Sequence, residues 1–218
     1  MTTIKKDIAI YGAGGYGREV ACLLKLINEK EPQWQFIGFF DDDPSLRGSQ
    51  NVYGPILGGM EELNQWDSDL SLVIAIGSPD GIRSIVQRMT NERIDYPNIV
   101  APSVVFLDRD SVKMGRGNIV GTNCFVSCNV EMGDFNIFNG YVPIGHDVKI
   151  GSCNVFMPSS HISGGVVIGD NNFMGLQAVV LQYLKIGNNT RIGANSVIMR
   201  KTKDGFLYIG NPAKRVEF

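Results

Sequence analysis

The chain has 218 residues, of which 44% are hydrophobic, with 20 basic against 22 acidic side chains and a formal net charge of −2. This length and composition are typical of a well-packed protein with one large or two small domains. The nearly balanced charge provides no broad positive field, so DNA and RNA are not expected partners. No apolar run reaches the roughly 18 residues of a membrane-spanning helix, so we expect a cytoplasmic protein without a membrane span.

The cysteines give no indication of a disulfide framework or a metal site. Cys22, Cys124, Cys128 and Cys153 form no C-x-x-C pair. Free cysteine behaves as a small hydrophobic residue, so we expect buried, inert thiols and no bound metal.

The first element along the chain is a strand, a glycine turn and a helix. Residues 8–11 predict a buried strand, and an apolar helical face begins at Val20. Between them, Gly12, Gly14 and Gly17 match the pattern G-x-G-x-x-G. Without side chains, such a loop lets the backbone approach a pyrophosphate at the amino terminus of the helix. The pattern therefore indicates a nucleotide-binding loop.

Two further strands complete a predicted βαβαβ unit. Residues 36–40 precede the acidic run 41–43, and residues 72–76 precede Gly77 and a second amphipathic helix. Carboxylates at the end of the second strand suit a ribose or a base, including the adenosine ribose of NAD, although they also suit a solvated turn. Fewer than about a hundred residues precede the next pattern, which is short for a dehydrogenase domain pair. A domain that binds a nucleotide is the simpler interpretation.

The second half of the chain repeats every six residues. The residue at every sixth position from Met114 to Ile198 is apolar, and the residue four positions later is small, short and polar, or apolar. This period predicts short strands wound into about five triangular coils, with large side chains stacked inside and Gly or Asn at the corners. We therefore expect two domains, residues 1–97 and 98–218. Glycine follows many of the apolar positions, at Gly115, Gly121, Gly133, Gly145, Gly151, Gly169, Gly175, Gly187 and Gly193.

The repeat and the nucleotide loop occur together with several specific segments. These are Tyr11–Gly17, Phe40–Pro44, Ala75–Gly77, Gly145–Gly151 and Ile209–Lys214. In this combination the chain resembles the hexapeptide-repeat sugar acetyltransferases, in the branch of sialic-acid O-acetyltransferases and UDP-4-amino-sugar N-acetyltransferases. The resemblance implies a Rossmann-like domain followed by a left-handed parallel β-helix. It also implies a homotrimer with active sites between subunits and acetyl-CoA as co-substrate.

The same resemblance implies roles for individual residues. The nucleotide sugar would contact Gly14, Gly15, Tyr16, Asp41, Asp42 and Gly77. The pantetheine arm of acetyl-CoA would pass the backbone of Leu176 and Ala194, and Lys214 in the tail would lie near the CoA end. Many members carry a second CoA-contacting histidine where this chain has Val155, so that contact is expected to be lost or replaced here.

A catalytic base can be chosen between only two histidines. His146 follows the inward Ile144 by two residues, which places it on the outer surface of the coil, where an imidazole can accept a proton from an attacking amine or hydroxyl. Asp147 is the candidate that orients the ring, although adjacent strand residues point to opposite faces, so this pairing requires a corner. No role is expected for His161.

Four functions remain open at this point. We favour N-acetylation of a nucleotide-linked amino sugar, with O-acetylation of sialic acid or another sugar as the near alternative. Two alternatives belong to other classes of protein. One is an NAD-binding protein, and the other is a catalytically silent trimeric assembly protein that uses the coils only as a stalk.

Overall fold

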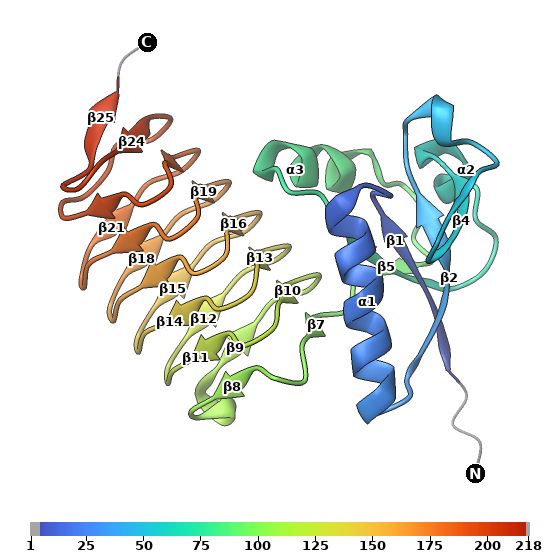
Figure 1. Cartoon of the computed structure of the whole chain (residues 1–218), viewed down its shortest axis with the longest axis horizontal. Coiled ribbons are helices and arrows are strands. Elements are labelled where there is room, and N and C mark those ends of the chain that lie inside the picture. Colours follow the sequence, from blue (N-terminus) through green and yellow to red (C-terminus); the bar gives the residue numbers. More distant parts are fainter. Residues whose placement is uncertain (1–4, 217–218) are drawn as a thin grey trace.

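A computed structural model describes residues 5–216, and Figure 1 shows a small α/β domain beside a long stack of triangular coils. The α/β domain has one sheet with strand order β3-β4-β2-β1-β5-β6. Its elements are β1 (Lys6–Tyr11), α1 (Gly15–Lys30), β2 (Trp34–Phe40), the 3-10 helix η1 (Pro44–Leu46), β3 (Gln50–Asn51), β4 (Gly54–Gly58), α2 (Met60–Asn64), β5 (Leu70–Ile74), α3 (Pro79–Arg88) and β6 (Ile94–Asp95).

The predicted βαβαβ unit is confirmed and extended by short elements. β1 pairs in parallel with β2, which follows it through α1, and with β5, from which α3 leads on to β6. β4 adds a parallel strand to β2, and β6 adds one to β5. Because β4, α2 and β6 are short, their patterns were not recognisable in the sequence.

The carboxy-terminal part is a β-helix with three flat faces. Face 1 contains β7 (Ile99–Val100), β10 (Ile119–Val120), β13 (Ile137–Phe138), β16 (Val155–Phe156), β19 (Phe173–Met174), β22 (Arg191–Ile192), β24 (Leu207–Ile209) and the antiparallel β25 (Lys214–Val216). Face 2 contains β8 (Val105–Phe106), β11 (Phe125–Val126), β14 (Pro143–Ile144), β17 (His161–Ile162), β20 (Val179–Val180) and β23 (Val197–Ile198). The 3-10 helix η2 (Arg109–Ser111) precedes face 3, which contains β9 (Lys113–Met114), β12 (Glu131–Met132), β15 (Lys149–Ile150), β18 (Val167–Ile168) and β21 (Lys185–Ile186).

The apolar residue of each hexad points inward, as the sequence predicted. Ile144, Phe156 and Val180, for example, are completely buried. The rings of Phe138 and Phe156 stack with centroids 4.7 Å apart and an interplanar angle of 3°, which shows how large side chains align along the axis.

A ladder of buried asparagines runs along the corner between faces 3 and 1. Asn118 Oδ1 accepts from the backbone N–H and side-chain amide of Asn136, and Asn136 Oδ1 accepts from both groups of Asn154. The pattern continues through Asn172 to the backbone N–H of Thr190. Each buried amide is thereby satisfied by the next coil, which removes the cost of burying it.

The repeated glycines do not have the role that the sequence suggested. The residues with positive φ lie two positions later and include Phe135, Tyr141 and Asp147. A Cβ on Gly121 would lie 2.9 Å from the Phe138 carbonyl oxygen, and one on Gly145 would lie 2.5 Å from the Gly164 nitrogen. Glycine therefore recurs because neighbouring coils approach closely, whereas the left-handed corners are occupied by several residue types.

The outward residue of each strand gives every face its own character. On face 3 these are mainly charged residues, with Lys113 and Lys149 both paired to Glu131. On face 2 they are mainly apolar, and on face 1 they are almost all apolar. The outward residues of face 1 are Ile99, Ile119, Ile137, Val155, Phe173 and Arg191, and those of face 2 are Val105, Phe125, Pro143, His161, Val179 and Val197.

The amino-terminal domain covers face 1. Helices α1 and α3 lie beside β10, β13, β16 and β19 in Figure 1, and Ile119, Ile137 and Val155 belong to the same buried cluster as the core of the α/β domain. At the margin, the Asp80 carboxylate accepts from the Asn171 amide at 2.8 Å and pairs with Arg191 at 3.3 Å. The core of the amino-terminal domain therefore extends onto face 1, while the inward residues of the coils form a second buried cluster.

This junction also contains Val155, where the sequence predicts that the CoA contact of the family is lost or replaced. Its side chain is only 1% exposed and packs in the cluster shared by the two domains. A side chain enclosed there cannot contact CoA, so the position of the second histidine has become a packing position in this chain.

The expectation of buried thiols holds for Cys124 alone. Burial raises the pKa of its thiol to about 11, which makes the thiolate scarce near neutral pH. Cys22, Cys128 and Cys153 are free and only partly buried. Within residues 5–216, no helix combines the length and apolar character that crossing a membrane requires.

Candidate active site

His146 and Asp147 form a hydrogen-bonded pair at the corner between faces 2 and 3. The corner follows β14, and the Nδ1 atom of His146 lies 2.8 Å from Oδ2 of Asp147. Both side chains are about half exposed, at 51% and 57%. The pairing that the sequence left open is thus present, because Asp147 has a φ of +58° and leaves the alternating strand conformation.

Asp147 is held from the coil on its amino-terminal side. Its N–H donates to the carbonyl of Cys128 at 3.0 Å, and its Oδ1 accepts from the Asn129 amide at 3.1 Å. The hydrogen bond with His146, followed by that with Asn129, holds the pKa of the Asp147 carboxyl below its ordinary value. A carboxylate that stays ionised at this place fixes Nδ1 as the protonated nitrogen and leaves Nε2 available to a substrate.

The imidazole ring of His146 packs against Gly164, a residue that the sequence analysis did not identify. We call this contact the seat of the imidazole. A Cβ at this position would lie 2.5 Å from Nε2 and 2.7 Å from Cε1 of His146. The ring therefore lies directly against the backbone of the next coil. A signal existed, because Gly164 follows His146 by one full coil of 18 residues and lies outside the recurring glycine register.

The glycine-rich loop divides into structural and open positions. A Cβ on Gly12 would lie 2.8 Å from the Ala75 carbonyl oxygen, and a Cβ on Gly17 would overlap the Gly12 carbonyl oxygen. By contrast, nothing lies within 4 Å of a Cβ on Gly14, Gly15 or Gly77, and all three residues are exposed. The first pair builds the turn, while the other three leave free space at the amino terminus of α1 where an anion could bind.

The two predicted carboxylates after β2 are already engaged by the protein. Asp41 accepts from the N–H groups of Ala13 and Asp43, at 2.8 and 3.0 Å. Asp42 pairs with Arg88 at 2.7 Å and accepts from the Met60 N–H at 3.0 Å. Burial opposes ionisation of Asp42, but these hydrogen bonds outweigh it and hold the pKa of its carboxyl below the ordinary value. Asp41 therefore ties the acidic turn to the glycine loop.

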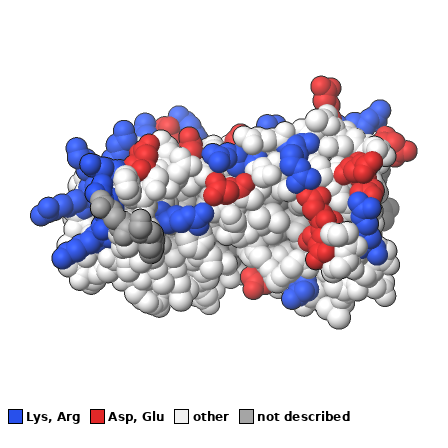
Figure 2. Space-filling model, turned by 90° about the horizontal axis from the view of Figure 1, so that it is seen from above, with Lys and Arg blue, Asp and Glu red and all other residues white. Residues whose placement is uncertain are grey.

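The residues expected to meet acetyl-CoA lie at the other edge of face 2. Leu176 and Ala194 are exposed and occupy successive coils of the corner between faces 1 and 2, where the Asn195 N–H donates to the Leu176 carbonyl at 2.8 Å. Above them, Arg200, Lys201 and Lys214 line a cavity of about 530 Å³. Figure 2 shows Lys and Arg gathered over this carboxy-terminal end of the coils.

One chain therefore does not bring all of its predicted site residues together. Gly14, Gly15 and Tyr16 lie at the domain that covers face 1, together with Asp41, Asp42 and Gly77. His146 and Asp147 lie at the corner between faces 2 and 3, which is the edge of the prism opposite face 1. The uncovered face 2 separates the two groups.

Comparisons with known proteins agree with this architecture. The PglD N-terminal domain family matches residues 7–89. A search of curated protein sequences finds no match. Among solved structures, the acetyltransferase domain of PglB from Neisseria gonorrhoeae in complex with acetyl coenzyme A is 26% identical, with a TM-score of 0.87, and covers 98% of this chain and 100% of its own. PerB from Caulobacter crescentus, in complex with CoA and GDP-perosamine, is 26% identical, with a TM-score of 0.85 and full coverage of both chains.

A third structure shows the same fold. WeeI from Acinetobacter baumannii is 24% identical, with a TM-score of 0.85 over 97% of this chain and 100% of its own. The fold and the matches define the class of this protein: a hexapeptide-repeat protein with a left-handed β-helix behind a Rossmann-like domain. Within that class, residues 7–89 match the PglD N-terminal domain family, and the whole chain shares the fold of the PglB and PerB acetyltransferase structures.

Proposed function

We propose that this protein transfers an acetyl group from acetyl-CoA to the amino group of a nucleotide-linked amino sugar. The observation that carries the proposal is the His146–Asp147 pair on a β-helix whose amino-terminal domain has an open glycine loop. The similar PglB domain was solved with acetyl coenzyme A, and PerB with CoA and GDP-perosamine. Both ligand classes fit the two regions of this chain.

His146 serves as the general base in this proposal. Its Nε2 accepts the proton of the amine as the nitrogen attacks the thioester carbonyl, while Asp147 keeps Nδ1 protonated and stabilises the imidazolium. Collapse of the tetrahedral intermediate then expels the CoA thiolate, which takes up a proton. General-base catalysis of this kind contributes about 10² to 10⁴ in rate.

The backbone beside the imidazole supplies a candidate donor for the oxyanion. The Gly164 N–H donates to no backbone carbonyl in the described part of the chain, and this residue is the one against which the ring lies. A preorganised N–H next to the base can stabilise the negative charge that develops on the thioester oxygen. Gly164 thus suits two tasks, seating the ring and donating to the intermediate.

We propose further that the active protein is a homotrimer. Face 1 is covered within the chain and face 3 is charged, but face 2 exposes an apolar row in which Val105 and Phe125 are 55% and 37% exposed. Burying this row against a second copy is favourable, because exposed apolar rows of this kind mark association surfaces. Its two edges carry His146 on one side and Leu176 on the other, so a copy on face 2 would complete the site.

In this arrangement, acetyl-CoA lies between two subunits. Its pantetheine arm passes Leu176 and Ala194, and its phosphates lie near the basic cavity lined by Lys214. The acceptor nucleotide binds at Gly14, Gly15, Tyr16 and Gly77 of one subunit, while His146 comes from its neighbour.

Thiol release from acetyl-CoA tests the proposal. The acceptors are nucleotide-linked 4-amino sugars, including GDP-perosamine, and free sialic acid as the O-acetylation alternative. We expect activity on an amino-sugar nucleotide and a loss of about 10² to 10⁴ in kcat for His146→Ala. Lys185→Ala, an exposed change on face 3, is the control and should keep full activity.

Two results would contradict the proposal. Equal rates for wild type and His146→Ala would exclude this histidine as the base. Turnover of sialic acid alone, with none on any nucleotide-linked amine, would replace N-acetylation by O-acetylation on the same scaffold.

A further inference from the structure

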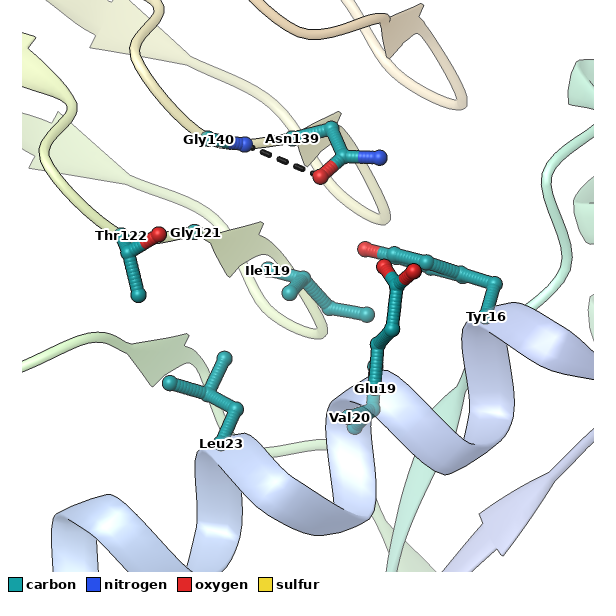
Figure 3. A pocket seen from close by; sticks show the side chains of 9 residues that line it. All are labelled: Tyr16, Glu19, Val20, Leu23, Ile119, Gly121, Thr122, Asn139 and Gly140. Carbon is teal, nitrogen blue, oxygen red and sulfur yellow. Dashed lines mark hydrogen bonds between the residues drawn. The ribbon is translucent and has the colours of Figure 1, made fainter.

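A small cavity lies where helix α1 meets the corner between faces 1 and 2. It has a volume of about 90 Å³, and Figure 3 shows its lining from both domains. Leu23 and Ile119 form the apolar side. Tyr16, Glu19 and Asn139 bring their polar groups to the other side, where the Glu19 carboxylate lies beside the Tyr16 hydroxyl.

Two polar groups of this cavity have no hydrogen-bond partner among the described residues. Asn139 Oδ1 accepts from the Gly140 N–H at 2.9 Å, but its amide nitrogen has no partner among the described residues. Glu19 makes neither an ion pair nor a hydrogen bond in the described part of the chain, and it is the one charged residue in the lining. A carboxylate acceptor beside an amide donor is a set that binds hydroxyl groups of a small ligand.

The cavity lies near the glycine loop of its own subunit and on the same coil as the candidate base. Glu19 lies four residues after Gly15 in the helix, which corresponds to a rise of about 6 Å. A phosphate bound at the helix terminus would therefore be separated from Glu19 by about the length of one pyranose ring. Asn139 and His146 belong to the same coil of the β-helix. If neighbouring β-helices are parallel and level, the cavity of one subunit faces the His146 corner of the next.

We propose that this cavity is the sugar-ring subsite and that Glu19 determines which sugars enter it. This inference rests on the proposed function. Glu19 accepts hydrogen bonds from ring hydroxyl or amino groups, while Asn139 donates to a ring oxygen. Because one carboxylate repels another, the site selects neutral or cationic sugars and rejects acidic ones.

Calorimetric binding separates the sugar from the nucleotide. The probes are GDP, GDP-mannose and GDP-mannuronic acid, and the same series with UDP, UDP-glucose and UDP-glucuronic acid. We expect the wild type to bind a neutral sugar nucleotide more tightly than its acidic counterpart. Glu19→Gln should lose about tenfold to a hundredfold in affinity for the neutral sugar nucleotide, with no change for the diphosphate alone.

Two further variants sharpen the test. Asn139→Asp keeps the acceptor for the Gly140 N–H but adds a second carboxylate, so rejection of the acidic sugar should increase. Glu29→Gln removes a charge from an exposed position on the same helix and should leave every affinity unchanged.

The outcomes distinguish this inference from the function on which it rests. Thiol release on GDP-perosamine by the wild type, with unchanged sugar affinity in Glu19→Gln, would overturn the subsite and leave the acetyltransferase standing. An equal loss for the diphosphate and the sugar nucleotide would also overturn it, because Glu19 would then act on the nucleotide. Failure of the wild type to bind any sugar nucleotide would refute both.

Discussion

Faces 1 and 2 of the β-helix carry similar rows of outward apolar residues, but only face 1 is covered within the chain. Ile119 and Ile137 on face 1 are 1% and 2% exposed, whereas Val105 on face 2 is 55% exposed. The hexad pattern requires only the inward residue to be apolar. An apolar outward row is therefore additional information about what each face contacts. On face 1 that partner is the chain's own amino-terminal domain, and on face 2 it is a second copy in the trimer proposed above. Face 3, with its paired charges, is the reference for a face that contacts water.

The largest expected effect comes from placing a charge on face 2. Val179→Asp should convert the trimer into folded monomers and reduce activity by more than about a hundredfold, since the base and the acceptor site would no longer meet. Size-exclusion chromatography with light scattering, circular dichroism and thiol release measure the three properties. Val167→Asp, at the same hexad position on face 3, should change none of them. A fully active monomer would disprove the intersubunit site.

On face 1 the expected effect is on folding. Ile137→Ala removes a side chain buried between the two domains and should lower the free energy of unfolding by about 2 to 5 kcal/mol. Val167→Ala on face 3 should change it by less than about 0.5 kcal/mol. Guanidinium unfolding measures both. Similar small losses for the two variants would mean that face 1 is not a structural interface.

At the edge of face 2, Gly164→Ala tests the seat of the imidazole. The added methyl group would displace the His146 ring and should reduce kcat about a hundredfold while the trimer persists, because small misplacements of a catalytic group have effects of this size. Gln182→Ala is the matched control, since position 182 is the equivalent corner of the following coil and already accepts a side chain. An unchanged kcat in Gly164→Ala would show that the ring does not need this seat.

The smallest expected effect lies in the amino-terminal domain, away from both apolar faces. The pKa of the Asp42 carboxyl is lowered in the folded state, so its stabilising contribution is present above the unfolded value of about 3.9 and is lost as the pH falls through the lower folded value. Because the side chain is partly exposed, Asp42→Asn should cost at most about 1 kcal/mol, a decrease of about 2 to 4 °C in Tm at neutral pH. Thermal unfolding between pH 7 and 3 should show this difference shrinking on acidification. A difference that grows at low pH would contradict the sign.

Two residues of the proposed site were missed by the sequence analysis. Gly164 matters because it stands one coil away from His146, and Glu19 because α1 packs against Asn139 of the other domain. The sequence also could not show what takes the place of the lost contact at Val155, which packs in the cluster shared by the two domains. Each of these outcomes depends on which surfaces dock.

The sequence by itself determined the β-helix and the strand–glycine loop–helix unit, because a period of six leaves few alternatives. The choice of His146 as the base stays a prediction, made from a list of only two histidines. The sequence also identified Asp147, although not the corner conformation that lets adjacent residues pair. Only the tertiary structure decided which glycines build the turn, which apolar face is covered and where an unpaired carboxylate lies beside a cavity. The physical reason is that periodicity records an environment repeated along the chain, whereas docking between domains joins residues that share no spacing, and the fit between two coils depends on the individual side chains that meet there.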